Sequence, residues 1–242
     1  MSFLINPYTF GVAGPPAWTP ASLFESSELG VYYDPSVLSS IWQDSDRTVA
    51  GAVDSPVGAM DDLSGNGNHA LQTVDVSRPI LRLSGGKYHL ECDGVDDGLL
   101  FGTLAAMGTG AEMCFGIQST KTTWLFISRL GTSSPLIPIA QDGSSSPNTA
   151  GAGAPTILVD RAALASNDRN GVHDAVTSAN SKVVTIHTVD LTLLTTGEIA
   201  GAGSGFEFGG KIHSCVIVPG LSAENRALLE DWTALKSGVT LP

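Results

Sequence analysis

Residues 61–70 read DDLSGNGNHA and residues 91–99 read ECDGVDDGL, and these two stretches decide the fold. Both are dense in Gly, Asn, Asp and Ser. These residues supply positive-φ positions and hydrogen bonds from side chains to the backbone. We therefore expect two tight, ordered turns that flank a short strand.

Three separated segments carry a resemblance to a known family. They are the turn at 61–70, the ECDGVDD segment at 91–97, and GGKIH at 209–213 followed by LSAENR at 221–226. In this order they resemble the laminin-G-like form of the concanavalin A-like lectin/glucanase superfamily, which is common in bacteriophage virion proteins. The resemblance covers about residues 30–238. It implies an all-β fold, an antiparallel jelly-roll β-sandwich with one C-terminal helix.

The sequence departs from that family pattern at two positions. Cys92 stands where the family usually has an aromatic residue, and Gly98 stands where an aromatic residue often follows the paired acids. The second change removes a ring that could stack on a sugar.

Charge limits the partners. The 242 residues include 24 acidic and 12 basic side chains, a formal net charge of -12. Such a surface repels nucleic acid and anionic membranes, so we expect neither as a partner.

The chain has no apolar run long enough to cross a bilayer, and its start lacks the basic and apolar regions of a signal peptide. The expected location is a virion assembled in the host cytoplasm.

Residues 1–27 differ in composition from residues 28–242. Prolines interleave there with the aromatic residues Phe3, Tyr8, Phe10 and Trp18. Proline removes amide donors and favours extended backbone, so an extended N-terminal arm is predicted before a sandwich at 28–242. The arm packs either on its own sandwich or on a neighbouring subunit; the second alternative makes these four aromatics the assembly residues.

Short apolar runs between turn signals predict the strands, and several of them alternate, as Met113, Phe115 and Ile117 do. The predicted strands span 30–33, 87–92, 112–118, 123–128, 135–140, 155–160, 182–189 and 211–218. The segments 141–154 and 165–181 are predicted to be flexible loops. A helix is predicted between an N-cap at Ser222 and a stop at Gly238. Leu228, Trp232 and Leu235 are expected on its buried face.

No catalytic residue is assigned, and the chain is expected not to be an enzyme. Glu91 and Asp93 lie two apart on a predicted strand, as in glucanases of the superfamily, but the local pattern differs from their E-x-D-x-x-E. A glycoside hydrolase remains the weaker alternative. No His cluster has metal-ligand spacing, and the five histidines are interpreted as turn or surface residues.

Calcium is the one cofactor for which the sequence offers candidate ligands. Asp62, Asn66, Asp93, Asp96 and Asp97 could offer it oxygen ligands. Asp and Asn are also the ordinary turn residues, so structural turns are preferred and no metal site or cofactor is expected. The three cysteines, Cys92, Cys114 and Cys215, are expected to be reduced and buried.

The leading interpretation is a structural component of a bacteriophage particle, in the tail, the baseplate or a surface decoration. It would dock by its arm and a sandwich face to other virion proteins or to copies of itself, with a host surface glycan as a further contact. The alternative is a carbohydrate-binding module, with or without calcium. Trp42, Tyr88 and Trp124 are the aromatics that could stack on a sugar there, although strand aromatics are more often core residues.

Overall fold

The computed structural model describes residues 18–120, 155–166, 168–192, 194, 196–201 and 208–242, and between 121 and 154 only the backbone of four two-residue strands. Those four form two small antiparallel pairs: β9 (Trp124–Leu125) with β12 (Ile139–Ala140), and β10 (Arg129–Leu130) with β11 (Ser134–Pro135). The predicted loop at 141–154 lies outside the described residues.

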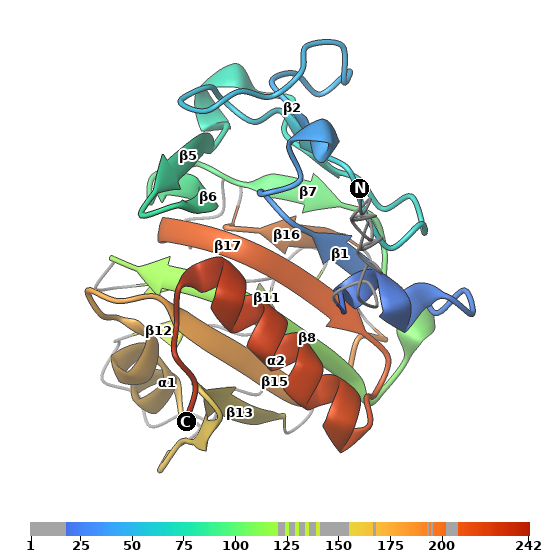
Figure 1. The fold of residues 1–242 in the computed structure, drawn as a ribbon, viewed down its shortest axis with the longest axis vertical. Coiled ribbons are helices and arrows are strands. Elements are labelled where there is room, and N and C mark those ends of the chain that lie inside the picture. The colour runs from blue at the N-terminus through green and yellow to red at the C-terminus, as the bar shows by residue number, and fades with distance from the viewer. Residues whose placement is uncertain are drawn as a thin grey trace, which may run out of the picture.

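The described part is mostly β, with two main antiparallel sheets and two α-helices, consistent with an all-β sandwich (Figure 1). The larger sheet, sheet A, has eight strands. In spatial order they are β14 (Ala162–Ala163), β13 (Thr156–Val159), β15 (Lys182–Val189), β8 (Ala111–Ser119), β17 (Gly209–Val218), β6 (Lys87–Asp93) and β5 (Ile80–Ser84), and β1 (Val31–Tyr33) also pairs with β17.

The smaller sheet, sheet B, has five strands and meets one face of sheet A. Their order is β16 (Gly197–Ile199), β7 (Leu99–Phe101), β4 (Ala70–Leu71), β3 (Ala59–Met60) and β2 (Ile41–Trp42). The short 3-10 helices are η1 (Pro20–Phe24), η2 (Leu38–Ser40), η3 (Asp75–Ser77) and η4 (Ala105–Met107).

Alternation along the strands builds two apolar clusters. In β8, Phe115 and Ile117 join the main core, which also contains Leu99 and Phe101 of sheet B. Cys114 points to the opposite side and joins a second cluster beneath the C-terminal helix. The period-2 pattern read from the sequence is therefore confirmed, and sheet A is apolar on both faces.

The C-terminal helix, α2 (Ala223–Ser237), lies across the outer face of sheet A (Figure 1). Ser222 caps its start by accepting a hydrogen bond from the Asn225 backbone N–H at 3.2 Å, and Gly238 ends it with a φ of 72°. Both predicted ends are confirmed. Glycine suits position 238 because it has no Cβ and adopts the left-handed backbone conformation without a steric clash.

The buried face of α2 differs from the predicted one. Trp232 is buried, as expected, and meets Tyr32 edge-on at 5.4 Å. Leu235, however, is 65% exposed, and Leu229 takes the buried place instead. The expectation of a Leu228, Trp232 and Leu235 face was wrong because polar side chains also fix how the helix is rotated about its axis.

Those polar side chains form ion pairs that span the interface between α2 and the rest of the chain. Arg226 pairs with Glu112 of β8, and Glu230 with Arg161 at 2.9 Å. Lys236 pairs with Asp34 at 2.7 Å. These contacts occur near the beginning, middle and end of the helix, so they set both its direction and its rotation.

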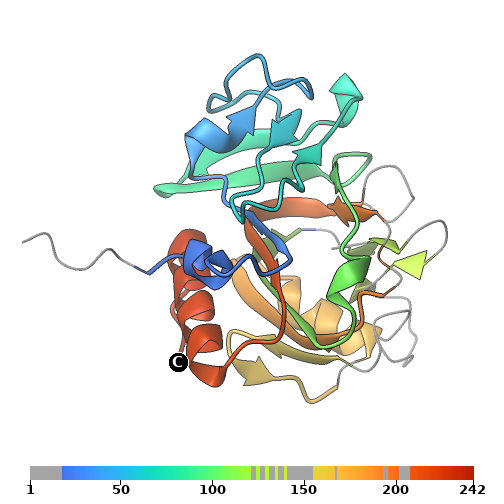
Figure 2. The same ribbon diagram turned by 90° about the vertical axis from the view of Figure 1, so that its right-hand side faces the viewer.

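Part of the predicted arm lies on the sandwich. Leu23 and Phe24 of η1 are buried in the same cluster as Trp232, and Trp18 packs at its margin. Figure 2 shows this segment beside α2. Phe3, Tyr8 and Phe10 lie outside the described residues, and the boundary at residue 27 stays a prediction.

A second helix corrects two expectations, the flexible loop at 165–181 and the single C-terminal helix. It is α1 (Arg169–Val176), and Val172 and Val176 on it are fully buried. Asp168 caps its start by accepting a hydrogen bond from the Gly171 backbone N–H at 2.7 Å. The cap and two valines one helical turn apart offset the poor helix propensity of Asn and Gly in this segment.

All three cysteines are free and buried, as expected. Neither described helix has the length and apolar character needed to span a membrane.

Candidate functional site

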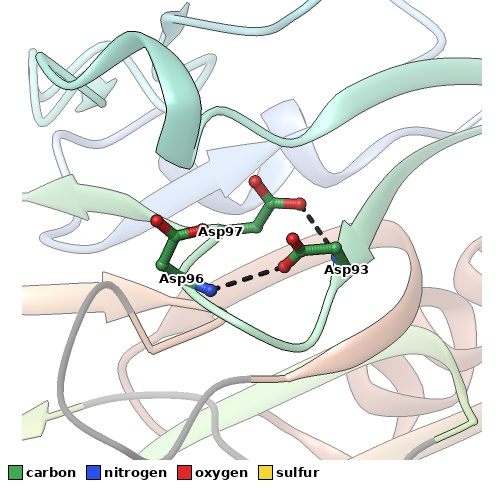
Figure 3. Close-up of side chains that lie close together, drawn as sticks. All are labelled: Asp93, Asp96 and Asp97. Carbon is green, nitrogen blue, oxygen red and sulfur yellow. Dashed lines mark hydrogen bonds between the residues drawn. The ribbon is translucent and has the colours of Figure 1, made fainter.

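The turn between β6 and β7 gathers three carboxylates, those of Asp93, Asp96 and Asp97 (Figure 3). One oxygen from each lies within 4.8 Å of the other two. Gly94 follows β6 with a φ of 78°, which reverses the chain sharply. The turn thus brings Asp96 and Asp97, which follow Asp93 by three and four positions, close to the Asp93 carboxylate.

Hydrogen bonds inside the turn hold these carboxylates in place. Asp93 Oδ1 accepts from the backbone N–H of Val95 at 2.7 Å and of Asp96 at 3.4 Å. Asp97 Oδ2 accepts from the backbone N–H of Asp93 at 2.8 Å. Figure 3 shows Asp97 reaching back over the turn to Asp93. This is the structural turn that the sequence predicts.

Asp96 connects the turn to the segment before β5. Its Oδ2 accepts a hydrogen bond of 2.9 Å from the Ser77 hydroxyl, and the Gly98 backbone N–H donates to the Ser77 carbonyl at 3.2 Å. These two bonds join the 91–99 stretch to the SRP segment at 77–79.

The three side chains differ in burial. Asp93 is exposed, whereas Asp97 is only 5% exposed. The pKa of Asp97 is raised to about 6, mainly by burial. The hydrogen bond from the Asp93 backbone N–H opposes this rise, and the negative charges of Asp93 and Asp96 contribute to it.

An all-oxygen set of this kind suits a hard cation such as calcium, which would lower the repulsion among the three charges.

The other two calcium candidates lie elsewhere and act as structural ties. Asp62 accepts hydrogen bonds of 3.0 Å from the backbone N–H groups of Tyr32, Ser64 and Asn68. Asn66 donates its amide to the carbonyls of Glu28 and Gly30. They fasten the 61–70 turn onto the start of β1.

Glu91 is held in an ion-pair row on the outer face of sheet A. Arg82 lies between Glu91 and Asp54, at 2.7 Å from each. A cross-strand arginine thus engages the carboxylate that the glycoside-hydrolase alternative would use.

The candidate aromatic platform is not brought together. Trp42 lies in sheet B and donates its indole N–H to Asp61 at 2.9 Å, while Tyr88 lies in sheet A and packs on the main core. The side chain of Trp124 lies outside the described part of the chain.

Three of the five histidines are buried rather than exposed in turns or on the surface: His89, His173 and His213. The rings of His89 and His213 lie 5.3 Å apart. Burial, and to a smaller extent the neighbouring His89, lowers the pKa of His213 to about 4. β17 pairs with β6 so that Ile212 lies opposite Leu90, and the next residue along each strand brings His213 beside His89. The sequence predicts both strands but not that they pair with each other.

No known protein family and no curated protein matches the sequence. Among solved structures, the fold is similar to Trypanosoma rangeli sialidase in complex with the inhibitor DANA, at 12% identity and a TM-score of 0.43. The match covers 86% of this chain and spans 37% of the sialidase chain. The family resemblance read from the sequence gains no support from these comparisons.

One expectation is corrected by the last comparison. The chain is expected from its sequence not to be an enzyme, but this structural neighbour, a sialidase, is an enzyme. At this degree of similarity, the match assigns no activity to the chain.

Proposed function

We propose that this chain is a structural component of a bacteriophage particle, with a concanavalin A-like jelly-roll sandwich that attaches to its neighbours through the N-terminal segment. The sequence resemblance in the 61–70, 91–97 and 209–226 segments supports the particle assignment, and the two antiparallel sheets are compatible with it.

The anchoring of η1 against α2 carries the attachment part of the proposal. Leu23 and Phe24 are buried beside Trp232, and α2 is itself fixed to sheet A by ion pairs. A binding segment that precedes residue 18 would therefore start from a rigid platform, which reduces the entropy lost on docking.

The direct test looks for this chain in particles purified from cells that produce it, by mass spectrometry and by antibody labelling in electron micrographs. We expect the chain in the particle at a fixed copy number. Its absence from purified particles would overturn the proposal.

Two truncations separate assembly from folding. A variant that starts at Trp18 keeps Leu23 and Phe24, so we expect a normal melting temperature together with loss of the chain from particles. The matched variant that starts at Glu25 removes both side chains from the apolar cluster, so its melting temperature should fall. Incorporation of the Trp18 variant at the normal level would contradict attachment through residues 1–17.

A further inference from the structure

A polar pocket lies at the C-terminal end of α2, and none of the three acids of the 93–97 turn lines it. Its volume is about 470 Å³, within the range of small-molecule sites. It is lined by the outer face of β8 and β17, by the segment that leads into β15, and by the chain just after α2. The lining side chains that the argument uses are Gln118, Asp160, Asn180, Ser181, Lys182 and Lys211.

The walls of this pocket are fixed by contacts within the protein. Gln118 donates its amide to the Ala179 carbonyl, which attaches the 179–182 segment to β8. The Ser181 hydroxyl meets His213 Nε2 at 3.1 Å. Lys211 lies opposite Gln118 on the neighbouring strand. The pocket is therefore preformed, which favours binding without a large ordering cost.

The two lysines of the pocket differ in how their charge is neutralised. Lys182 forms an ion pair with Asp160 at 2.8 Å. Glu91, the cross-strand neighbour of Lys211, is engaged by Arg82 instead. Among the residues that the structure describes, no carboxylate lies within ion-pair distance of the Lys211 ammonium. The described lining thus has one uncompensated positive charge.

We propose that this pocket binds a small hydroxylated monocarboxylate, with Lys211 as its charge partner. One ammonium balances one carboxylate, whereas a dianion such as phosphate would keep an unpaired charge beside Asp160. Asn180 and Ser181 also line the pocket, and their side chains can hydrogen-bond to hydroxyl groups of the ligand. None of the described residues that line the pocket is aromatic, so polar contacts dominate the binding.

D-gluconate is the probe, and D-glucitol is the matched control that has the same hydroxylated carbon chain without the carboxylate. Titration calorimetry on the full chain at low salt should show binding of gluconate that weakens as salt is added. Glucitol and inorganic phosphate should bind more weakly than gluconate. No binding of gluconate, or phosphate binding as tight as that of gluconate, would overturn the proposal.

Two variants locate the site. Lys211→Gln should weaken gluconate binding by about tenfold, because it removes the charge-assisted contact. Arg47→Gln removes one positive charge at an exposed ion pair with Asp61, outside the pocket, and should bind as the natural chain does. Melting temperatures confirm that both variants fold. Equal gluconate affinity of the folded Lys211→Gln variant and the natural chain would overturn the assignment.

Discussion

Arg226 of α2 and Glu112 of β8 form a salt bridge in which the arginine Nε lies 2.8 Å from Glu112 Oε2. Glu112 is 4% exposed and also accepts a hydrogen bond of 3.0 Å from the Leu221 backbone N–H. The LSAENR motif thus caps the helix with its serine and attaches the helix to sheet A with its arginine. A buried carboxylate held in this way depends on its partner, because removal of the arginine would leave Glu112 with only His187 at 3.3 Å and the Leu221 N–H.

Replacing Arg226 with alanine should therefore destabilise the fold by about 3 kcal/mol. Urea denaturation of the natural chain and of Arg226→Ala measures the difference. Arg47→Ala is the control, because it breaks a pair at the surface with Asp61 and should cost less than about 1 kcal/mol. Equal effects of the two substitutions would show that the Arg226 pair contributes no more than an exposed one.

Replacing Trp232 with alanine should cost about 3–5 kcal/mol, the usual loss for a buried aromatic side chain. The ring contacts Tyr32 and is covered by the Lys236 ammonium at 5.2 Å from its centroid. Leu235→Ala, one helical turn along, should change stability by less than about 0.5 kcal/mol because Leu235 is exposed. A thermal melt in which both variants match the natural chain would contradict the packing of α2 on sheet A.

Asp97→Asn should stabilise the chain at neutral pH. Because the pKa of Asp97 rises to about 6 on folding, the native state holds its proton more tightly than the unfolded chain does. Its stability contribution is present below the unfolded pKa and is lost as pH rises through about 6. The amide removes this loss, which is worth up to about 3 kcal/mol when the pKa of Asp97 rises to about 6 on folding.

The measurement compares the variant and the natural chain at about pH 8 and about pH 4, where the gain should be large and absent respectively. Asp96→Asn is the control from the same turn and should gain less, since Asp96 is less buried. A gain of the same size at both pH values would mean that the charge of Asp97 is not its cause.

A chelator should leave the melting temperature of the chain nearly unchanged, because the carboxylates of Asp93 and Asp97 already accept hydrogen bonds within the turn and that of Asp96 accepts one from Ser77. Differential scanning calorimetry with EDTA, and then with added calcium, tests this. A large fall that calcium restores would identify the three carboxylates as ligands, since a cation that binds only the folded state stabilises it.

Long elements with a clear period were predictable from the sequence. The strand at Lys182–Val189 was predicted with its observed ends, and the caps Ser222 and Gly238 gave the limits of α2. Sheet B was not predicted, because strands such as Ile41–Trp42 and Ala59–Met60 are two residues long and show no period. Their pairing is decided by tertiary contacts.

The acidic turn was predictable in its residues but not in its electrostatics. The spacing of Asp93, Asp96 and Asp97 indicates a turn, yet only the fold shows that Asp97 is buried and Asp93 exposed. The polar pocket gave no sequence signal, since Gln118, Asn180 and Lys211 come from three separate segments.

The position of β17 has a consequence for how the chain folds as it leaves the ribosome. This strand lies at the middle of sheet A, where β8 pairs along one side and β6 and β1 along the other. Val31 therefore lacks its strand partner until Ile217 has been synthesised. Such distant pairing slows folding, and a nascent chain that does not yet contain β17 exposes β8, which is buried along nearly its whole length in the folded protein. The described part of sheet A is completed only after β17 has been synthesised.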